Sequence, residues 1–180
     1  MQDEAVLVEK VLAGNREAFE PLVRKYAPRI YRVVLRMVHH SEDARDLTQE
    51  IFFQVYRKLS SYQPDRRFST WLYQIAVNRC IDELRKRKGK RLVALNDEWV
   101  SNEPGPEKVA IDRMRVDDIL KSLDGMPENW KLIFLLRFVD DLSYSEIAEV
   151  LGISLNDVRN GLYRTRQKLR MQFQAKEGAG

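Results

Sequence analysis

Residues 142–169 read LSYSEIAEVLGISLNDVRNGLYRTRQKL, and this stretch decides the fold class. Ser143 is placed to cap a short helix, and Glu146 three residues later completes a capping box. Gly152 follows that helix, where a left-handed backbone is common, and Ser154 can cap a second, basic helix. A short helix, a turn with glycine and a second basic helix predict a helix-turn-helix, which is a DNA-reading unit.

One face of the second helix carries the groups that suit a major groove. At about 100° per residue its apolar positions form one stripe, which we expect to be buried. Arginine can bind guanine, asparagine can pair with adenine, and the remaining groups can hold phosphates. The predicted DNA-binding residues are Arg159, Asn160, Tyr163, Arg164 and Arg166. A solvated basic face is the alternative. Asp157 is interpreted as structural, because an acid is favourable at a helix start.

Helical spacing of apolar residues recurs in several stretches of the 180-residue chain, which has only 8 Gly and 6 Pro. Asn15 can cap a helix that Pro28 kinks or interrupts, and Ser41 can cap the next one. Ser69 can cap a third helix that runs to about Lys88. Further helices are expected at 113–123 and 128–138. The sequence therefore predicts an all-α fold.

Charge is segregated along the chain. Residues 79–91 hold seven Lys/Arg against two acids, a net +5, and residues 156–170 hold five against one, a net +4. Residues 93–112 between them hold five acids and one Lys, a net −4, around Pro-Gly-Pro. We interpret this acidic stretch as a flexible linker. The predicted organisation is two small helical domains, 1–92 and 113–175, joined by linker 93–112.

The helix that begins at Thr70 has an unusual polar side. A tryptophan lies there beside amides and an arginine, and aromatic faces with basic groups are what an unstacked base needs. The alternative is that the preceding helix covers the tryptophan. The polar side consists of Trp71, Gln74, Asn78 and Arg85, and Tyr62 and Phe68 in the preceding loop could extend its aromatic surface.

The helix at 43–59 has a chemically different outer face. Acids, an amide and a phenylalanine lie opposite its buried stripe, which suggests a protein contact, although scattered exposed apolar residues are also normal. The residues of this face are Asp46, Gln49, Glu50 and Phe53.

Catalysis and cofactors are not indicated. His39 and His40 are adjacent and cannot chelate one ion together on a helix, and Cys80 falls on an apolar arc. The sequence contains no glycine-rich phosphate loop and no apolar run long enough for a membrane span. We expect a soluble, cytoplasmic protein without a cofactor or metal, which is not an enzyme.

Four stretches together resemble a known family. They are GNREAFEPLVRKY (14–26), DARDLTQEIF (43–52), RFSTWLYQIAVNRCIDELRKRK (67–88) and the helix-turn-helix stretch quoted above. In this order they resemble the extracytoplasmic-function (ECF) group of sigma-70 family RNA polymerase sigma factors. The resemblance implies two helical domains, of sigma regions 2 and 4, without the other domains of housekeeping sigma factors.

The resemblance also implies roles for particular residues. Asp46, Gln49, Glu50 and Phe53 would dock the clamp helices of the polymerase beta-prime subunit, and the second domain would meet the beta flap. Loop 62–68 and the helix after it would capture a flipped base and open the −10 element, with Trp71, Asn78 and Arg79 foremost. The last helix would read the −35 element. Promoter DNA, core polymerase and an anti-sigma factor are the implied partners.

One position departs from the family pattern. Many relatives have Gly-Thr-Val where this chain has Asn156-Asp157-Val158.

The length of the linker has a further implication. Promoter elements two DNA turns apart are separated by about 70 Å. A relaxed 20-residue coil spans about 25 Å, and a fully stretched one about 70 Å. We therefore expect the free protein to bind promoter DNA poorly until polymerase draws its domains apart.

Two rival functions remain open at this level. A stand-alone helix-turn-helix regulator with an N-terminal sensing domain would protect an operator without polymerase. An adaptor protein would show no salt-dependent affinity for DNA.

Overall fold

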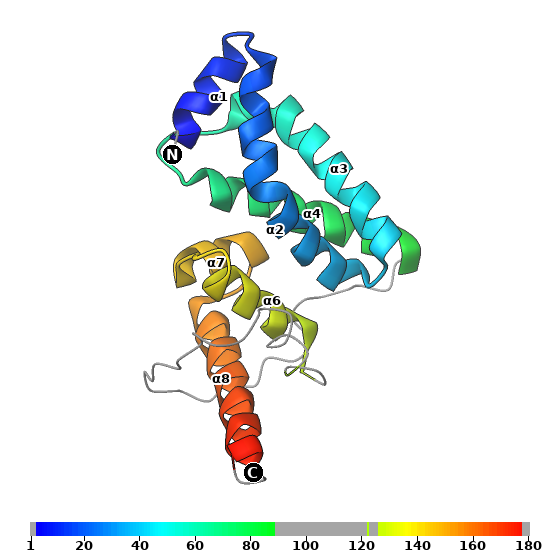
Figure 1. The fold of residues 1–180 in the computed structure, drawn as a ribbon, viewed down its shortest axis with the longest axis vertical. Coiled ribbons are helices and arrows are strands. Elements are labelled where there is room, and N and C mark those ends of the chain that lie inside the picture. The colour runs from blue at the N-terminus through cyan, green and yellow to red at the C-terminus, as the bar shows by residue number, and fades with distance from the viewer. Residues whose placement is uncertain (1–2, 89–121, 123–125, 178–180) are drawn as a thin grey trace. The chain divides into compact units, whose positions relative to one another are not determined.

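The computed structural model describes residues 3–88, 122 and 126–177, and regular structure within these ranges is helical. The chain divides into two compact units, Met1–Val93 and Ala94–Gly180 (Figure 1). The prediction of an all-α fold with two helical domains is confirmed. Linker 93–112 and, apart from Ser122, the expected helix at 113–123 lie outside the described residues. The limits of the domains and linker therefore stay predictions.

Three long helices build the first unit around one core. Helices α2, α3 and α4 pack against one another, and the short α1 and two 3-10 turns complete the unit (Figure 1). In chain order the elements are α1 (Glu4–Leu12), η1 (Arg16–Phe19), α2 (Glu20–Val38), α3 (Ser41–Lys58), η2 (Leu59–Ser61) and α4 (Phe68–Lys88).

The start of α2 differs from the sequence prediction. Asn15 precedes η1 rather than a long helix, and its side chain makes no capping bond. Helix α2 also continues through Pro28, which the sequence predicted to kink or interrupt it. Pro28 lies on the exposed side, while Tyr26 and Ile30 on either side of it are buried. Burial of the apolar stripe offsets the backbone hydrogen bond that proline cannot make.

The starts of α3 and α4 are shifted by one or two residues. Helix α2 ends at Val38, and the C-cap residue His39 is left-handed with φ 59° and donates its N–H to the Leu35 carbonyl at 2.9 Å. His40, not Ser41, then occupies the N-cap position of α3 without a side-chain bond. Helix α4 already begins at Phe68, and Ser69 lies buried inside its first turn. Burial of this first turn outweighs the local preference of serine for a cap.

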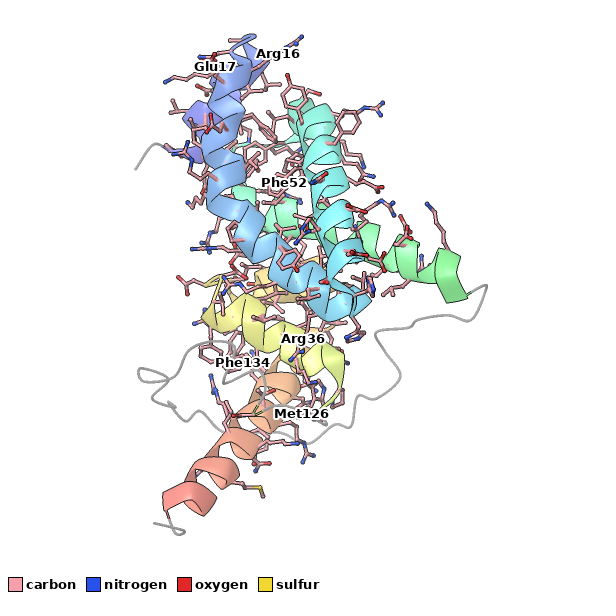
Figure 2. The ribbon with its side chains drawn as sticks, turned by 45° about the vertical axis from the view of Figure 1, so that its right-hand side comes forward. Arg16, Glu17, Arg36, Phe52, Met126 and Phe134 are labelled. Atoms are coloured by element: carbon pink, nitrogen blue, oxygen red, sulfur yellow. The ribbon has the colours of Figure 1, made fainter. Side chains whose placement is uncertain are left out.

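The core of the first unit consists of the apolar stripes predicted from helical spacing. Ile30 and Val33 of α2, Ile51 of α3 and Ala76 of α4 are fully buried. Phe52, labelled in Figure 2, adds an edge-to-face contact with Phe19, with the ring centroids 6.5 Å apart. The inward prediction for α3 is confirmed along its whole length.

The second unit contains the predicted helix-turn-helix. Its described elements are α6 (Glu128–Phe138), α7 (Tyr144–Leu151) and α8 (Leu155–Glu177), and each helix packs against the other two. Phe134 and Leu135 of α6 form a core cluster with Leu169 of α8, and Met126 packs against it; Figure 2 labels Phe134 and Met126.

No helix within the described ranges is long and apolar enough to cross a membrane. The same residues contain no cluster of three or more His, Cys, Asp or Glu side chains that could hold a metal ion.

Candidate nucleic-acid and protein interfaces

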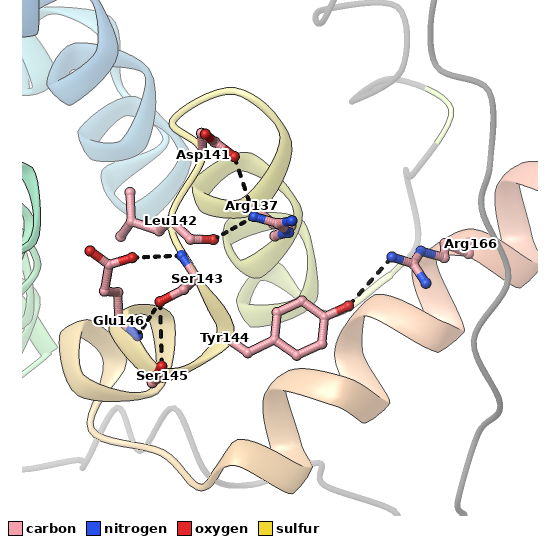
Figure 3. Close-up of polar contacts among 8 residues, drawn as sticks. All are labelled: Arg137, Asp141, Leu142, Ser143, Tyr144, Ser145, Glu146 and Arg166. Atoms are coloured by element: carbon pink, nitrogen blue, oxygen red, sulfur yellow. Dashed lines mark hydrogen bonds and ion pairs between the residues drawn. The ribbon is translucent and has the colours of Figure 1, made fainter.

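The helix-turn-helix is held by the capping box that the sequence predicted. The Glu146 N–H donates to Ser143 Oγ at 3.2 Å, and the Ser143 N–H donates to Glu146 Oε2 at 2.7 Å (Figure 3). Gly152 ends α7 with φ 65°, in the left-handed region. Both bonds and the left-handed turn fix the angle at which the chain enters α8.

A second reciprocal cap begins α8 and gives Asp157, where the chain departs from the family pattern, a local role. The Asp157 N–H donates to Ser154 Oγ at 3.1 Å, while the Ser154 N–H and hydroxyl donate to Asp157 Oδ2 at 3.1 and 2.6 Å. The carboxylate is thereby occupied at the positive end of the helix dipole. The interpretation of Asp157 as a structural residue agrees with these contacts.

Four of the five predicted residues of α8 are at least partly accessible. Arg159 is exposed, and Tyr163, Arg164 and Arg166 are half-buried. The Tyr163 hydroxyl accepts a hydrogen bond from Gln167 Nε2 at 2.7 Å, which holds the phenol along the helix surface. These side chains are available to bases and phosphates.

Asn160 differs from the helical-wheel expectation, because its side chain is only 4% exposed. The next residue, Gly161, is buried too, and Thr165 Oγ1 donates to the Gly161 carbonyl at 2.7 Å. A helical wheel identifies the apolar stripe of a single helix, but it does not show how much of the helix surface neighbouring elements bury. Among the residues that the structure describes, Asn160 Oδ1 has no hydrogen-bond partner, and the side chain is not accessible to a base in this conformation.

Arg166 connects α8 to its neighbours within the second unit. Its Nη2 donates to the Tyr144 hydroxyl of α7 at 3.5 Å (Figure 3), and its guanidinium lies 5.7 Å from the ring centroid of Phe138 of α6. Arg137 of α6 similarly lies over the Tyr144 ring. Arg166 thus stabilises the packing of α8, which the sequence prediction of a DNA contact did not include.

Aromatic residues before and within α4 form a cluster rather than an open stacking platform. The Tyr62 ring lies 5.4 Å from Phe68 and 5.5 Å from Trp71, and Phe68 also contacts Tyr26 of α2. Phe68 is 1% exposed and Tyr62 is buried. The expectation that these two rings offer stacking surface is therefore wrong, because their faces are used in the core. Trp71 is half-buried and keeps part of its surface accessible.

The aromatic cluster supports an exposed turn. The Tyr62 hydroxyl donates to the Arg66 carbonyl at 2.7 Å, and the Arg66 N–H donates to the Gln63 carbonyl at 3.1 Å. Burial raises the pKa of the Tyr62 phenol, and nearby carboxylates add to this effect. Residues 63–67 (QPDRR) are all exposed. The resemblance implied that loop 62–68 captures a flipped base, but the polar residues 63–67 were not singled out individually from the sequence.

The polar side of α4 is accessible where the sequence predicted it. Gln74 is half-buried, and Asn78 and Arg85 are exposed. Arg85 Nη1 lies 3.9 Å from Asp82 Oδ1, a distance at which the ion pair leaves the guanidinium available to solvent. Asn78 and Arg85, with the half-buried Trp71 and Gln74, form the accessible nucleic-acid candidates of this helix.

Arg79 points to α3 instead. Its Nη2 donates to Glu50 Oε2 at 2.5 Å and its Nη1 donates to Glu83 Oε2 at 3.3 Å, and the side chain is 13% exposed. Burial alone would lower the pKa of the guanidinium, but the two carboxylates raise it. The predicted role of Arg79 as a leading DNA contact is not supported by this geometry, because its charge is used within the protein.

The outer face of α3 has the composition that the sequence predicted. Asp46, Gln49 and Glu50 are exposed, and Phe53 is 64% exposed. Arg57 lies over the Phe53 ring at 5.8 Å, and exposed Tyr56 contacts Phe19. Tyr56 and Arg57 were missed, although their spacing of three and four residues after Phe53 places them on the same side.

The remaining reactive side chains show no catalytic arrangement within the described residues. Cys80 is fully buried, and burial raises the pKa of its thiol to about 12. Such a thiol stays protonated and is a poor nucleophile. His40 Nδ1 lies 3.5 Å from Asp43 Oδ2 on the surface of α3.

Comparison with known families agrees with this geometry. The family model described as "Sigma-70 region 2" matches residues 22–90, and "Sigma-70, region 4" matches residues 117–169. The three-helix core with its acidic face and the helix-turn-helix thus define a protein of the sigma-70 class.

Individual similar proteins identify a group within the sigma-70 class. The chain is 36% identical over 156 residues to the ECF RNA polymerase sigma factor SigE of Mycolicibacterium smegmatis, covering 85% of this chain and 60% of that protein. It is 30% identical over 176 residues to the ECF RNA polymerase sigma factor SigW of Bacillus subtilis, covering 92% and 94%. The chain therefore belongs to the ECF group of RNA polymerase sigma factors.

A solved structure shares the fold. The sigma factor RpoE of Bartonella quintana, crystallised with the anti-sigma factor NepR, superposes with a TM-score of 0.61 at 17% identity, covering 87% of this chain and 96% of that one.

Proposed function

We propose that this sigma factor uses three separate surfaces in promoter-specific initiation of transcription. The α3 face docks the beta-prime clamp helices of core polymerase. The turn at 63–67 and the polar side of α4 hold the separated −10 strand. Helix α8 reads the −35 element in duplex DNA. The protein is a specificity subunit rather than an enzyme, since the polymerase supplies the chemistry, and it acts in the cytoplasm where polymerase and DNA are found.

The observation that carries this proposal is the chemical contrast between the α3 face and the DNA-facing helices. The α3 face presents Asp46, Glu50 and an exposed Phe53, which suit a protein partner and would repel phosphate. Helix α8 instead presents Arg159 and Arg164, and α4 presents Asn78 and Arg85. A stand-alone regulator would have no use for an exposed acidic and aromatic face beside a strand-binding helix.

The energetics of strand capture fit the available groups. Unstacking and flipping a base costs a few kcal/mol, and stacking on one aromatic side chain returns about 1–3 kcal/mol. Trp71 is the aromatic residue of this region that remains partly accessible. The exposed turn then supplies the polar groups that surround the flipped base.

Transcription reconstituted from sigma-free core polymerase, this protein and a promoter library tests the proposal. We expect start sites that share −10 and −35 sequences and that are absent with core alone. Phe53→Ala should reduce binding to core, and Arg159→Ala should reduce selection at the −35 position without affecting core binding. If the protein creates no start sites but protects a duplex operator alone, it is a stand-alone regulator.

We also propose an anti-sigma protein as a regulatory partner. Support comes from the family and from the relative crystallised with such a partner, although its likeness to this chain extends only to the fold. The protein purified from its own cells should carry this partner, and core polymerase should displace it. A partner that binds simultaneously with core would contradict the proposal.

A further inference from the structure

Arg79 lies on the helix proposed to bind DNA, but its contacts serve the polymerase-docking face. Helices α3 and α4 pack side by side (Figure 1). Across this contact Arg79 Nη2 meets Glu50 Oε2 at 2.5 Å, 29 residues earlier in the sequence. Glu50 is a member of the acidic and aromatic α3 face. A residue of one proposed surface is therefore bonded to a residue of another.

The environment of Arg79 argues against a second role in binding phosphate. Its side chain is 13% exposed, whereas the Glu50 side chain is 57% exposed. The second carboxylate, Glu83, contacts the other terminal nitrogen at 3.3 Å. Both terminal nitrogens of Arg79 already donate to carboxylates, so a phosphate would have to compete with Glu50 and Glu83 for the guanidinium.

The exposed part of this triad is the carboxylate that faces the proposed partner. Glu50 accepts the Arg79 bond through Oε2, and no described residue donates to its Oε1, so this oxygen can accept a hydrogen bond from a docked chain. A glutamate on a helix surface ordinarily samples many rotamers, and fixing it on binding costs entropy. An arginine held beneath it removes much of that cost before docking.

We infer that Arg79 is a positioning residue for polymerase docking: it holds Glu50 of α3 ready for a cationic donor of the polymerase and does not contact promoter DNA. The inference rests on the proposed function of the α3 face. It reassigns one residue of α4 and leaves Asn78 and Arg85 as the strand-binding groups.

Matched substitutions of two arginines on the same helix test the inference. Arg79→Gln should weaken the affinity for core polymerase about five- to tenfold and leave the salt dependence of binding to a single-stranded −10 oligonucleotide unchanged. The Arg85 side chain is 57% exposed. Arg85→Gln should leave the affinity for core polymerase unchanged and weaken the salt dependence of binding to the single-stranded oligonucleotide. It should reduce the slope of log affinity against log salt by about 0.7, the value for one lost phosphate contact on single-stranded DNA.

A double-variant cycle separates positioning from general stabilisation. Glu50→Gln should also weaken core binding, and adding Arg79→Gln to it should cause little further loss, because both changes remove the same interaction. Arg79→Lys keeps one charged donor and should restore part of the core affinity. If thermal unfolding shows that Arg79→Gln does not fold, the affinity of Arg79→Lys for core polymerase is measured in its place.

Four results would overturn the inference. A salt slope reduced by about 0.7 in Arg79→Gln would make Arg79 a phosphate ligand. Losses of core affinity that multiply in the double variant would make the two residues independent. Normal core binding by Arg79→Gln, with Glu50→Gln impaired, would leave the docking face in place and remove only the positioning role. Normal core binding by Glu50→Gln would instead remove Glu50 from the docking face, and the inference with it.

Discussion

Glu4 shows how one side chain can fasten a short helix to a long one. Its Oε1 accepts hydrogen bonds from Lys25 Nζ and the Tyr26 hydroxyl of α2, both at 2.5 Å. Burial alone would raise the pKa of the Glu4 carboxyl. These two bonds and the charges of Lys25 and Arg67 outweigh burial, so the pKa lies below its ordinary value of 4.5. The ionised carboxylate therefore stabilises the attachment of α1.

Glu4→Gln should lower the free energy of unfolding by about 1–2 kcal/mol at pH 7. Since the folded-state pKa is depressed, the stabilisation by Glu4 is complete above pH 4.5 and is lost as pH falls through the folded-state pKa. Urea denaturation at pH 7 and at several values below pH 4.5 should show the difference between wild type and variant shrinking. Glu9→Gln removes an exposed acid from the same helix and is the control. An equal loss in both variants would contradict the role of Glu4.

Tyr62→Phe isolates the hydroxyl that closes the exposed turn. The ring contacts with Phe68 and Trp71 remain, and only the bond to the Arg66 carbonyl is lost. We expect a stability loss of about 1 kcal/mol and clearly faster amide exchange of Arg66, with weaker discrimination at the −10 base. Tyr31→Phe is the control, because the Tyr31 hydroxyl makes no hydrogen bond to a described residue. Unchanged exchange at Arg66 would show that the turn holds without this bond.

For single residues, the sequence predicted the chemical type of each surface better than the exposure of its side chains. Phe53 is exposed as its position on the wheel predicted, because α3 has one packed side. Phe68 and Asn160 were expected to be exposed and are buried. Their burial depends on contacts with distant parts of the chain, which the periodicity of a single helix does not contain.

Whole helices were more predictable than their first residues. The bounds of α6 and the capping box of α7 agree with the sequence, since strong apolar runs and reciprocal caps are local signals. Helix α1 was not expected, and α4 begins at Phe68 before its predicted cap. The signal for α1 was local and was missed, since Asp3 caps this helix by accepting the Ala5 N–H at 3.2 Å. Helix α4 begins early because Phe68 packs against Tyr26 of α2, a contact that local propensity does not contain.

Pro28 inside α2 offers a test of how packing overrides propensity. The residue is exposed, so Pro28→Ala loses little contact, restores a backbone N–H and removes the ring clash with the preceding turn. We expect the free energy of unfolding to rise by about 1–2 kcal/mol, less than the full difference between proline and alanine in a helix. Thermal unfolding of the full chain would record a higher Tm. A lower Tm would mean that α2 needs the proline at this position.

Two substitutions of Asp157, at the start of α8, distinguish the effect of helix capping from the effect of negative charge. Asp157→Ala removes the bonds with Ser154 and should cost about 1 kcal/mol, with faster amide exchange in the first turn of α8 and weaker −35 binding. Asp157→Asn keeps an acceptor and removes the negative charge. It should preserve the turn and bind duplex DNA at least as tightly as wild type. If both variants bind DNA more tightly, repulsion rather than capping governs this position.

At the scale of the molecule, the sequence predicted two helical units because a change of charge and Pro-Gly-Pro indicated a linker, and the structure does divide into two units. The proposed −10 groups belong to the first unit and the proposed −35 groups to the second. Neither set alone specifies a promoter. Each unit is therefore expected to bind its own DNA element weakly, and selectivity comes from joining the two binding events in one chain.

Cutting the linker tests this dependence on a single chain. A protease site inserted within 93–112 leaves both units intact after cleavage but makes the second binding event bimolecular. A tether supplies an effective concentration of the order of millimolar, so cleavage at nanomolar protein should reduce promoter-directed transcription at least about a hundredfold. Binding of the first unit to core polymerase should persist. The same protein with the site present but uncut is the control. Full transcription after cleavage would show that polymerase, not the covalent connection, holds both units at the promoter.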